Sequence, residues 1–464
     1  MGVPENRDHW ASRIGFVLAA AGSAVGLGNL WKFPYITWHN NGGAFVLVYL
    51  VCVAIIGLPI MMAEILMGRK TQESPVPAFQ KLGGRAWGIV GFFGVLTGFV
   101  ILGYYSVIAG WSIRSFVQCL GWTFNGYVPP ADDAFSNFIA DAPKQLLLSF
   151  VFLVATAFII WRGVSKGIEK AAKILMPVLL VILAYLVIRV MFLPGIGQTF
   201  HFLFRPNFSE LPATGVLEAL GHAFFTLSLG MGVMITYGSY MSKRESIFKS
   251  SVTVVFLDTF IALLACVIMY TIIYSVAGMS EQVQASSVGM LFVTLQRLFY
   301  EELAGGTLLG PLFYVLVGFA ALTSTISLLE VIVSFFIDKL GLKRHVATLI
   351  STAIVLVSMI GSALSLGAVP QLSSFEIFGG KQGVLSTLDH LASNWMLPIG
   401  GLLTTLFVGW FLSSKLIRGA PSRRQSGTAC FRVQAVAVLP EVHSAACNTR
   451  GNYSRDIWER LQLT

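Results

Sequence analysis

Two long apolar segments in this chain are each interrupted near the middle by clustered glycines. The first cluster holds Gly22, Gly26 and Gly28. The second, in the other half of the chain, holds Gly230 and Gly232. Glycine destabilises a helix interior, so we expect both segments to unwind at these points. Unwound backbone is tolerated at membrane depth only where protein or a water-filled site satisfies its polar groups. Two broken helices at matching places in two halves therefore predict a membrane transporter with a substrate site between them.

The composition supports a membrane location. Of the 464 residues, 55% are hydrophobic and 11% are charged, whereas soluble domains carry about 25% charged residues. Apolar stretches of about 18 residues or more, each able to cross about 30 Å of hydrocarbon, recur along the chain. We expect spans at residues 14–38, 43–67, 87–120, 145–162, 171–193, 214–240, 247–275, 308–338, 345–366 and 385–413.

Basic residues are distributed unevenly about these spans. Sixteen Lys and Arg lie in the loops on the N-terminal side, against six in the opposite loops and span ends. Because cytoplasmic loops carry the excess of Lys and Arg, we expect residues 1–13 in the cytoplasm and the chain in the inner (cytoplasmic) membrane. The net charge of +9 is then a topology signal, and we expect no nucleic-acid partner.

The spans contain no pattern typical of an enzyme. They hold no His-Glu-x-x-His sequence and no nucleophile–base arrangement. The five cysteines show no paired metal spacing. We therefore expect neither enzyme activity nor a cofactor.

The composition changes abruptly after the last span. Residues 415–464 carry eight Lys and Arg against three Asp and Glu, and no run there is long enough to cross a membrane. One interpretation is a flexible basic cytoplasmic tail. The other, favoured by the abrupt change, is that this stretch is out of frame relative to an ancestral gene that continued with further helices.

Oxygen-bearing groups in the spans leave two interpretations open. Carbonyls around Gly22 to Val25 and the Asn29 side chain could ligate a hard cation such as sodium, but Gly22 and Gly26 also suit a small-residue packing face. The hydroxyls of Thr323 and Ser324 could bond back to carbonyls one turn earlier. An acid deep in an apolar run is costly, so the default for Asp258 is a functional role.

Five ordered stretches make the sequence distinctive. They are Arg7-Asp8-His9-Trp10, residues 22–34, Met67-Gly68-Arg69, residues 224–230 and residues 320–324. Together they resemble the neurotransmitter:sodium symporter family, and within it the bacterial amino-acid transporters of the LeuT type. The resemblance covers roughly residues 5–415. It implies an all-α polytopic membrane protein with the LeuT-type fold, built from two five-helix inverted repeats at 14–195 and 212–413 with broken helices 1 and 6, without the later helices of the family.

The resemblance also implies two sodium sites. The first would take the carbonyls of Gly22, Val25 and Ala320 and the hydroxyls of Thr323 and Ser324. The second, shared with substrate, would use Ala24, Asn29, Thr226 and Asp258. An acid at position 258 in place of the usual amide resembles the chloride-independent bacterial members. Of the other intramembrane acids, Glu64 is expected to support a broken helix, and Glu330 has no assigned role.

The substrate implied by the resemblance is an amino acid. Its carboxylate would meet the amides of Leu27 and Gly28 and the hydroxyl of Tyr105, near the start of a half-helix. Its amine would meet carbonyls at Ala24, Phe225 and Thr226, with Ser228 nearby. The residues expected around its side chain are Ile101, Phe225, Met231, Ser324 and Leu328.

Two gates follow from the same resemblance. Arg7 and Asp338 resemble the cytoplasmic ion pair, with Trp10 and Tyr240 beside it. Lys32 and Asp389 resemble the outer pair, where lysine replaces the usual arginine and loses its two-pronged hydrogen bonding. Tyr105 and Phe225 would form an aromatic lid over the substrate.

These expectations define a sodium-coupled symporter that imports hydrophobic or aromatic amino acids by alternating access. The alternative is an amino-acid-binding sensor or a transport-impaired truncated homologue. Besides lipid, the expected partners are the amino acid and sodium as co-transported ion. The sequence leaves open the preferred amino acid, the number of sodium ions and the oligomeric state.

Overall fold

The structure, a computed structural model, describes residues 8–131, 133–242, 245–275, 289–301, 305–378, 380 and 382–412. Arg7 and the 415–464 tail lie outside these residues. The described chain is helical and contains no strand. Its first-half α-helices are α1 (Arg13–Ala24), α2 (Phe33–His39), α3 (Gly43–Cys52), α4 (Leu58–Thr71), α5 (Pro75–Gly83), α6 (Gly88–Asn125), α7 (Ala134–Ala140), α8 (Ala142–Trp161) and α9 (Lys170–Val190). Those of the second half are α10 (Ile196–Phe204), α11 (Ala213–Thr226), α12 (Val233–Ser239), α13 (Ile247–Ser275), α16 (Leu295–Glu301), α17 (Gly306–Leu340), α18 (Arg344–Leu364), α19 (Pro370–Ser373), α20 (Val384–Leu391) and α21 (Leu397–Leu406).

The apolar helices account for the spans expected from the sequence. Among the described residues, 8 continuous helical stretches are long and apolar enough to cross a membrane, and the bent pair Arg13–Ala24 and Gly28–His39 makes a ninth. The expected sixth span corresponds to α11 and α12, which are separated by the second break. Side chains such as Ile55, Phe92, Val181, Phe256 and Val357 point outward from these helices and are exposed. An exposed apolar belt of this kind suits a lipid environment.

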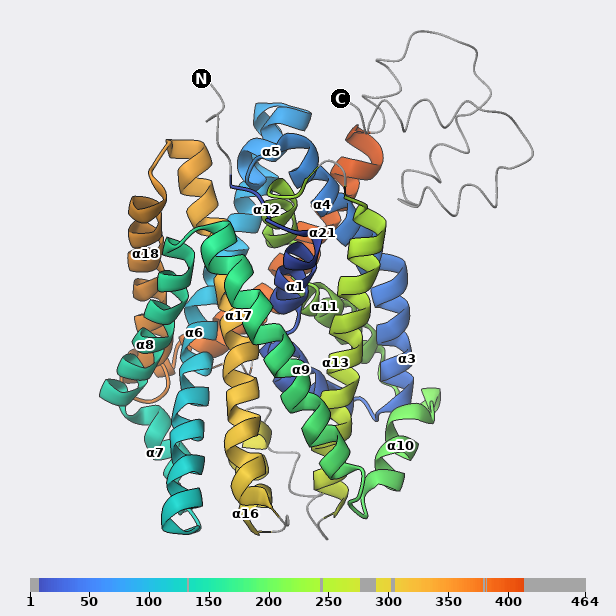
Figure 1. Cartoon of the computed structure of the whole chain (residues 1–464), viewed down its shortest axis with the longest axis vertical. Coiled ribbons are helices and arrows are strands. Elements are labelled where there is room, and N and C mark those ends of the chain that lie inside the picture. Colours follow the sequence, from blue (N-terminus) through green and yellow to red (C-terminus); the bar gives the residue numbers. More distant parts are fainter. Residues whose placement is uncertain are drawn as a thin grey trace, which may run out of the picture.

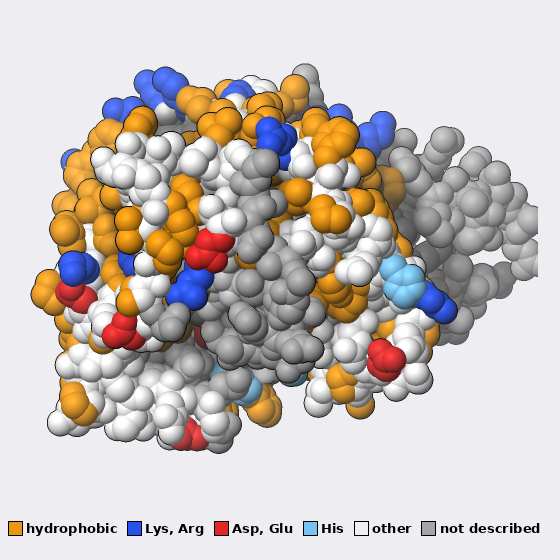
Figure 2. Space-filling view, turned by 90° about the horizontal axis from the view of Figure 1, so that it is seen from below, with side chains coloured by type: hydrophobic (Ala, Val, Ile, Leu, Met, Phe, Trp, Pro, Cys, Tyr) orange, Lys and Arg blue, Asp and Glu red, His pale blue; other side chains and the backbone are white. Residues whose placement is uncertain are grey.

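The broken helices lie near the middle of the bundle. In Figure 1, α1 and α11 lie centrally, with α6, α8 and α18 on one side and α3 and α13 on the other. The helix α5 lies at the same end of the molecule as the start of α1, whereas α7, α10 and α16 lie at the opposite end (Figure 1). Seen from that opposite end, charged side chains of both signs are scattered over the surface, and hydrophobic ones gather along the upper and left edges (Figure 2).

Both breaks occur where the glycines are clustered. The first bends the chain by 43° between Ala24 and Gly28. In the second, Ser228, Gly230 and Gly232 have φ of 54°, 76° and 77°, the left-handed region that glycine tolerates best. At Gly230 a Cβ would also lie 2.5 Å from the carbonyl oxygen of Leu397. The glycines therefore permit both the turn and the close packing of the break.

Helix α12 packs tightly against α4. A Cβ on Gly68 would overlap the carbonyl oxygen of Ile235, and one on Gly238 would lie 2.6 Å from the carbonyl oxygen of Ile65. Small residues let membrane helices approach this closely. The Met67-Gly68-Arg69 stretch thus has a packing role at the second broken helix.

We expect Gly68→Ala to destabilise the protein by about 1–3 kcal/mol, because the added methyl group must push two backbones apart. Thermal unfolding in detergent, followed by size-exclusion chromatography, measures the effect. Gly361→Ala in α18 is the matched control, since a Cβ there meets nothing within 4 Å. Equal stability of the two variants would contradict this packing role.

Candidate functional site

A small buried cavity of about 20 Å³ lies where the two broken helices meet α6 and α17. Ten of the eleven residues expected to contact substrate line it, and the exception is Leu27. Three lining residues were not foreseen: Ser23, Gly26 and Ser327. The full lining is Ser23, Ala24, Gly26, Gly28, Ile101, Tyr105, Phe225, Thr226, Ser228, Met231, Ser324, Ser327 and Leu328.

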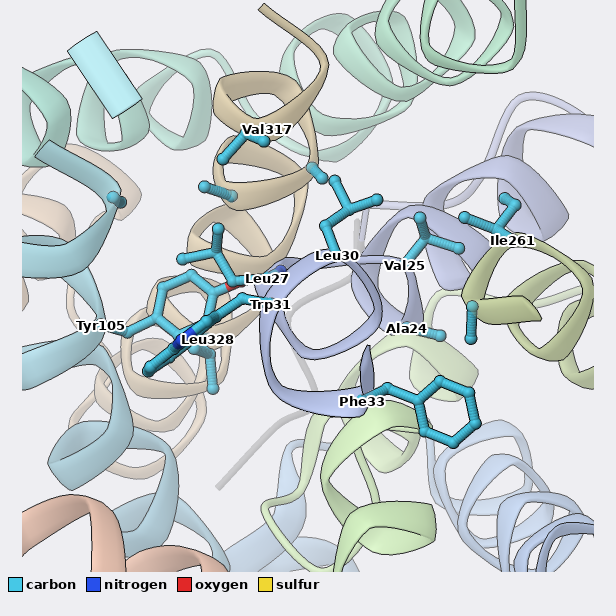
Figure 3. Close-up of a cluster of buried hydrophobic side chains, with 14 of the residues drawn as sticks. Ala24, Val25, Leu27, Leu30, Trp31, Phe33, Tyr105, Ile261, Val317 and Leu328 are labelled. Carbon is cyan, nitrogen blue, oxygen red and sulfur yellow. The ribbon is translucent and has the colours of Figure 1, made fainter. Parts of the chain in front are cut away.

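One side of the cavity is built from a backbone amide at the first break and a tyrosine. The amide of Leu27 donates to the Tyr105 hydroxyl at 2.9 Å, so Leu27 takes part through its backbone. Gly26 is required here, because a Cβ would lie 2.8 Å from the Tyr105 hydroxyl and overlap Ser324 Oγ. Figure 3 shows Tyr105 and Leu328 on one side of the first broken helix, and Val25 and Ile261 on the other. This amide–hydroxyl pair can bind a carboxylate.

A buried polar cluster joins the first broken helix to α11 and α13. Asn29 Nδ2 donates to Asp258 Oδ1 at 2.7 Å and to the Asp258 carbonyl at 3.1 Å. Thr226 Oγ1 donates to the same Oδ1 at 2.9 Å. The other carboxylate oxygen of Asp258 is buried and has no hydrogen-bond partner among the described residues. A buried carboxylate with a spare oxygen is costly alone and suits a cation ligand.

A second group of oxygens lies between α1 and α17. Thr323 Oγ1 is 3.5 Å from the Val25 carbonyl oxygen and 3.0 Å from that of Ala320. Gly22 faces Thr323, since a Cβ there would lie 3.2 Å from the Thr323 Cβ. The structure therefore brings Gly22, Val25, Ala320 and Thr323 together. The bond back to a carbonyl on the same helix and the contact across to α1 are both present.

Ser324 contacts both the first broken helix and the cavity. Its Oγ donates to the Ser23 carbonyl at 3.2 Å, and it also lines the cavity beside Tyr105. It therefore lies next to both Thr323 and the expected substrate.

The two residues expected at the outer gate form an ion pair. Lys32 Nζ lies 3.1 Å from Asp389 Oδ1 and donates to Ser393 Oγ at 2.8 Å. The same ammonium lies 5.0 Å from the centre of the Phe225 ring, within cation–π range. The Lys32 ammonium therefore contacts Phe225, an aromatic residue in the wall of the cavity.

Of the expected cytoplasmic pair, Arg7 lies outside the described residues. Its partner Asp338 accepts a hydrogen bond from the Ser74 amide at 2.6 Å. Trp10 is anchored at the end of α12: its Nε1 donates to the Tyr237 carbonyl at 3.0 Å, and its amide donates to the Tyr240 carbonyl at 3.1 Å.

The structure shows the hydrogen-bond partners of Glu330, which the sequence did not reveal. It is fully buried and accepts two hydrogen bonds from Arg344, at 2.8 Å and 2.9 Å, and one from the Tyr240 hydroxyl at 2.6 Å. Arg344 also lies 3.5 Å from Asp8. This network links α12, α17 and α18 to the chain before α1. The sequence signal was an intramembrane acid followed by an arginine at the start of the next span.

Two further glutamates support the broken helices. Glu64 Oε1 accepts from the Gly230 amide at 2.8 Å, which agrees with the supporting role expected for this acid. Glu169, not singled out from the sequence, accepts from the Ala11 amide at 2.6 Å and the Ser12 hydroxyl at 2.9 Å. It therefore secures the start of α1.

A bundle of apolar spans with two broken helices around one buried polar pocket defines a secondary transporter of the membrane. The family model described as "Sodium:neurotransmitter symporter family" matches residues 7–132 and 134–416. The chain belongs to this family. It is therefore a multi-pass sodium-dependent transporter and not an enzyme, and sodium is its co-transported ion.

Individual relatives agree with this assignment. YhdH of Bacillus subtilis, an uncharacterised sodium-dependent transporter, is 35% identical over 425 residues, which cover 91% of this chain and 92% of YhdH. The crystal structure of MhsT in complex with L-phenylalanine is similar with a TM-score of 0.81 and 38% identity, covering 93% of this chain and 96% of MhsT. This likeness confirms the LeuT-type fold. The sodium-dependent neutral amino acid transporter B(0)AT2 of Bos taurus is 28% identical over 303 residues, or 58% of this chain and 41% of the relative.

Proposed function

We propose that the chain is a symporter that uses sodium to import hydrophobic or aromatic amino acids by alternating access. The observation that carries the proposal is that both helix breaks line one cavity, where the Tyr105 hydroxyl accepts from the Leu27 amide and where Thr226 joins the cavity to Asp258. One place then offers donors for a carboxylate, carbonyls for an amine and a carboxylate for a cation. We assign residues 14–195 and 212–413 to the two inverted repeats, with the N-terminus in the cytoplasm of the inner membrane.

The two oxygen clusters are our candidates for sodium. Gly22, Val25, Ala320, Thr323 and Ser324 would hold one ion, and Ala24, Asn29, Thr226 and Asp258 the other. One charge moving through about 100 mV supplies about 2.3 kcal/mol, and a tenfold gradient adds about 1.4 kcal/mol. Two ions would supply roughly 7 kcal/mol for concentrating one zwitterion.

The closed contacts at both ends of the cavity favour a transporter over a sensor that does not cycle. Lys32–Asp389 closes one end, and the Glu330–Arg344 network lies at the other. Alternating access requires closures of this kind that can open in turn. The 415–464 stretch, which motivated the impaired-homologue alternative, lies outside the described residues.

The walls of the cavity favour large apolar side chains. Ile101, Met231 and Leu328 are nearly fully buried and provide an apolar surface. The cavity of about 20 Å³ is close to the size of one water molecule, so an amino acid must displace its walls. Methionine is unbranched and can move aside more easily than a rigid ring. The crystal structure of the similar protein MhsT contains L-phenylalanine, which supports an aromatic amino acid as a substrate here.

Met231→Phe is expected to weaken tryptophan binding roughly 10-fold or more, with less than a threefold loss for leucine. The rigid ring would occupy the space into which a bulky substrate pushes the native side chain. Competition against uptake of labelled leucine measures both affinities. Met231→Leu, which nearly conserves volume, is the control. Equal losses for the two substrates would contradict the placement of Met231, and preference of the native protein for glycine or alanine would contradict the substrate class.

The direct test of the function is uptake of labelled leucine and phenylalanine into proteoliposomes that contain the purified protein. We expect accumulation when sodium is higher outside, and none when sodium is equal on both sides without a potential. Sodium-dependent binding without accumulation would instead support the sensor alternative. Neither binding nor accumulation of any amino acid would overturn the proposed function.

A further inference from the structure

Four serines from three parts of the chain meet at the cavity. Ser23 lies in the last turn of α1, and Ser228 lies in the second break. Ser324 and Ser327 lie one turn apart on α17. Ser23 Oγ is 2.7 Å from Ser327 Oγ and 3.1 Å from Ser228 Oγ. The four line the cavity together, and we call them the serine cluster.

Each hydroxyl of the serine cluster has an acceptor within the protein. Ser228 and Ser324 donate to the Ser23 carbonyl at 3.0 Å and 3.2 Å. Ser327 donates to the Ser324 carbonyl at 2.8 Å. The single proton of Ser23 goes to Ser327 or Ser228. A hydroxyl has one proton and two lone pairs, so the cluster can offer the cavity acceptors and no free donor.

The amine of an amino acid does not need all of these acceptors. An ammonium has three protons, and the carbonyls of Ala24, Phe225 and Thr226 at the two breaks, with Ser228 beside them, are sufficient for it. Ser23 and Ser327 therefore remain as acceptors. Ser327 lies about 4.5 Å further along α17 than Ser324, next to the apolar wall at Leu328.

We propose that Ser23 and Ser327 accept a hydrogen bond from the side chain of the substrate, so that the site selects aromatic amino acids whose ring carries an N–H or O–H. This inference rests on the proposed function and narrows its substrate class. The ring body would lie on Ile101, Met231 and Leu328, while its donor reaches the serines. Tryptophan and tyrosine combine an apolar ring with such a polar tip, and phenylalanine lacks it.

The alternative role for the serine cluster is purely structural. The same hydrogen bonds hold α1, the second break and α17 together, and loss of a structural bond would weaken every substrate alike. Recognition of a side-chain donor would instead weaken only the substrates that carry one. The ratio between two substrates of equal shape separates these roles.

The experiment measures displacement of labelled phenylalanine, in sodium, by tryptophan and by 3-benzothienylalanine, whose ring has sulfur in place of the indole N–H. We expect the native protein to bind tryptophan roughly 2- to 10-fold more tightly, the range for one uncharged hydrogen bond. Ser327→Ala should bring this ratio close to one and change phenylalanine affinity less than twofold. Ser334→Ala is the matched control, because Ser334 lies on the same helix, donates to the Val331 carbonyl at 3.0 Å and does not line the cavity.

The outcomes distinguish this inference from the proposed function. Sodium-driven uptake of phenylalanine together with equal native affinities for the two analogues would overturn the acceptor role and leave symport standing. A native preference for tryptophan that persists in both Ser327→Ala and Ser23→Ala would also overturn it. Absence of any amino-acid binding or uptake would overturn both. The native ratio needs no variant, so the test holds even if a serine variant fails to fold.

Discussion

Replacing Asp258 with asparagine is expected to raise the sodium concentration for half-maximal uptake about tenfold to a hundredfold. Interactions with a charged group contribute about 1.5–3 kcal/mol, and each 1.4 kcal/mol is about tenfold in affinity. Asp258 is fully buried and bonded through one oxygen to Asn29 and Thr226. Asparagine keeps this shape and can still accept those bonds, so the variant mainly removes the charge. Sodium titration of labelled uptake measures the shift.

The charge of Asp258 also predicts the response to anions. If a fixed carboxylate supplies the negative charge, uptake by the native protein should not change when gluconate replaces chloride. The uptake that remains in Asp258→Asn at high sodium should become anion-sensitive. Asp141→Asn is the control, because Asp141 caps α8 by accepting from the Lys144 amide at 3.2 Å and lies far along the chain from the cavity residues. Native uptake that stops in gluconate, or an Asp258→Asn variant with normal sodium dependence, would refute this role.

Features encoded locally could be predicted from the sequence. The spans follow from runs of apolar residues, since each must cross the hydrocarbon alone. The breaks follow from glycine clusters, and the structure unwinds the chain at Gly26 and at Gly230. These properties belong to single segments, so no knowledge of neighbouring helices was needed.

Features that depend on helix packing could not be predicted from the residues alone. The contact between Lys32 and Asp389 was expected only through the family resemblance, because nothing near either residue indicates the other. Ser23 and Ser327 were missed because a serine in a membrane helix most simply bonds to its own backbone. Their convergence depends on how α1 approaches α17, and hydroxyls carry no hydropathy signal that would reveal it.

The environment of Glu330 falls between these two cases. The sequence identified Glu330 as an intramembrane acid but gave it no role, although Arg344 follows at the start of the next span. The connection between α17 and α18 is short, so Glu330 and Arg344 are close in the sequence. Their ion pair could therefore have been predicted. The contributions of Tyr240 and Asp8 come from distant segments and required the structure.

Thr323→Val is expected to raise the sodium requirement for uptake roughly tenfold, while the relative affinities for different amino acids stay unchanged. Valine nearly matches threonine in shape and removes the oxygen that lies between Val25 and Ala320. Loss of one ligand oxygen leaves a hard cation less well coordinated, and about 1.4 kcal/mol corresponds to tenfold. Changing Ser324 as well would confuse the result, because Ser324 also lines the substrate cavity.

The matched control for Thr323→Val is Thr325→Val, two residues along the same helix. The Thr325 hydroxyl is also buried, but it lies 2.8 Å from Thr156 on α8, away from the cavity. Both variants lose one hydroxyl from α17, so a general effect on helix stability should appear in both. A sodium shift confined to Thr323→Val would support a cation site between α1 and α17. An equal shift in both variants, or none in either, would mean that the Thr323 hydroxyl only bonds back to its own helix, and the site would have to be sought among other oxygens.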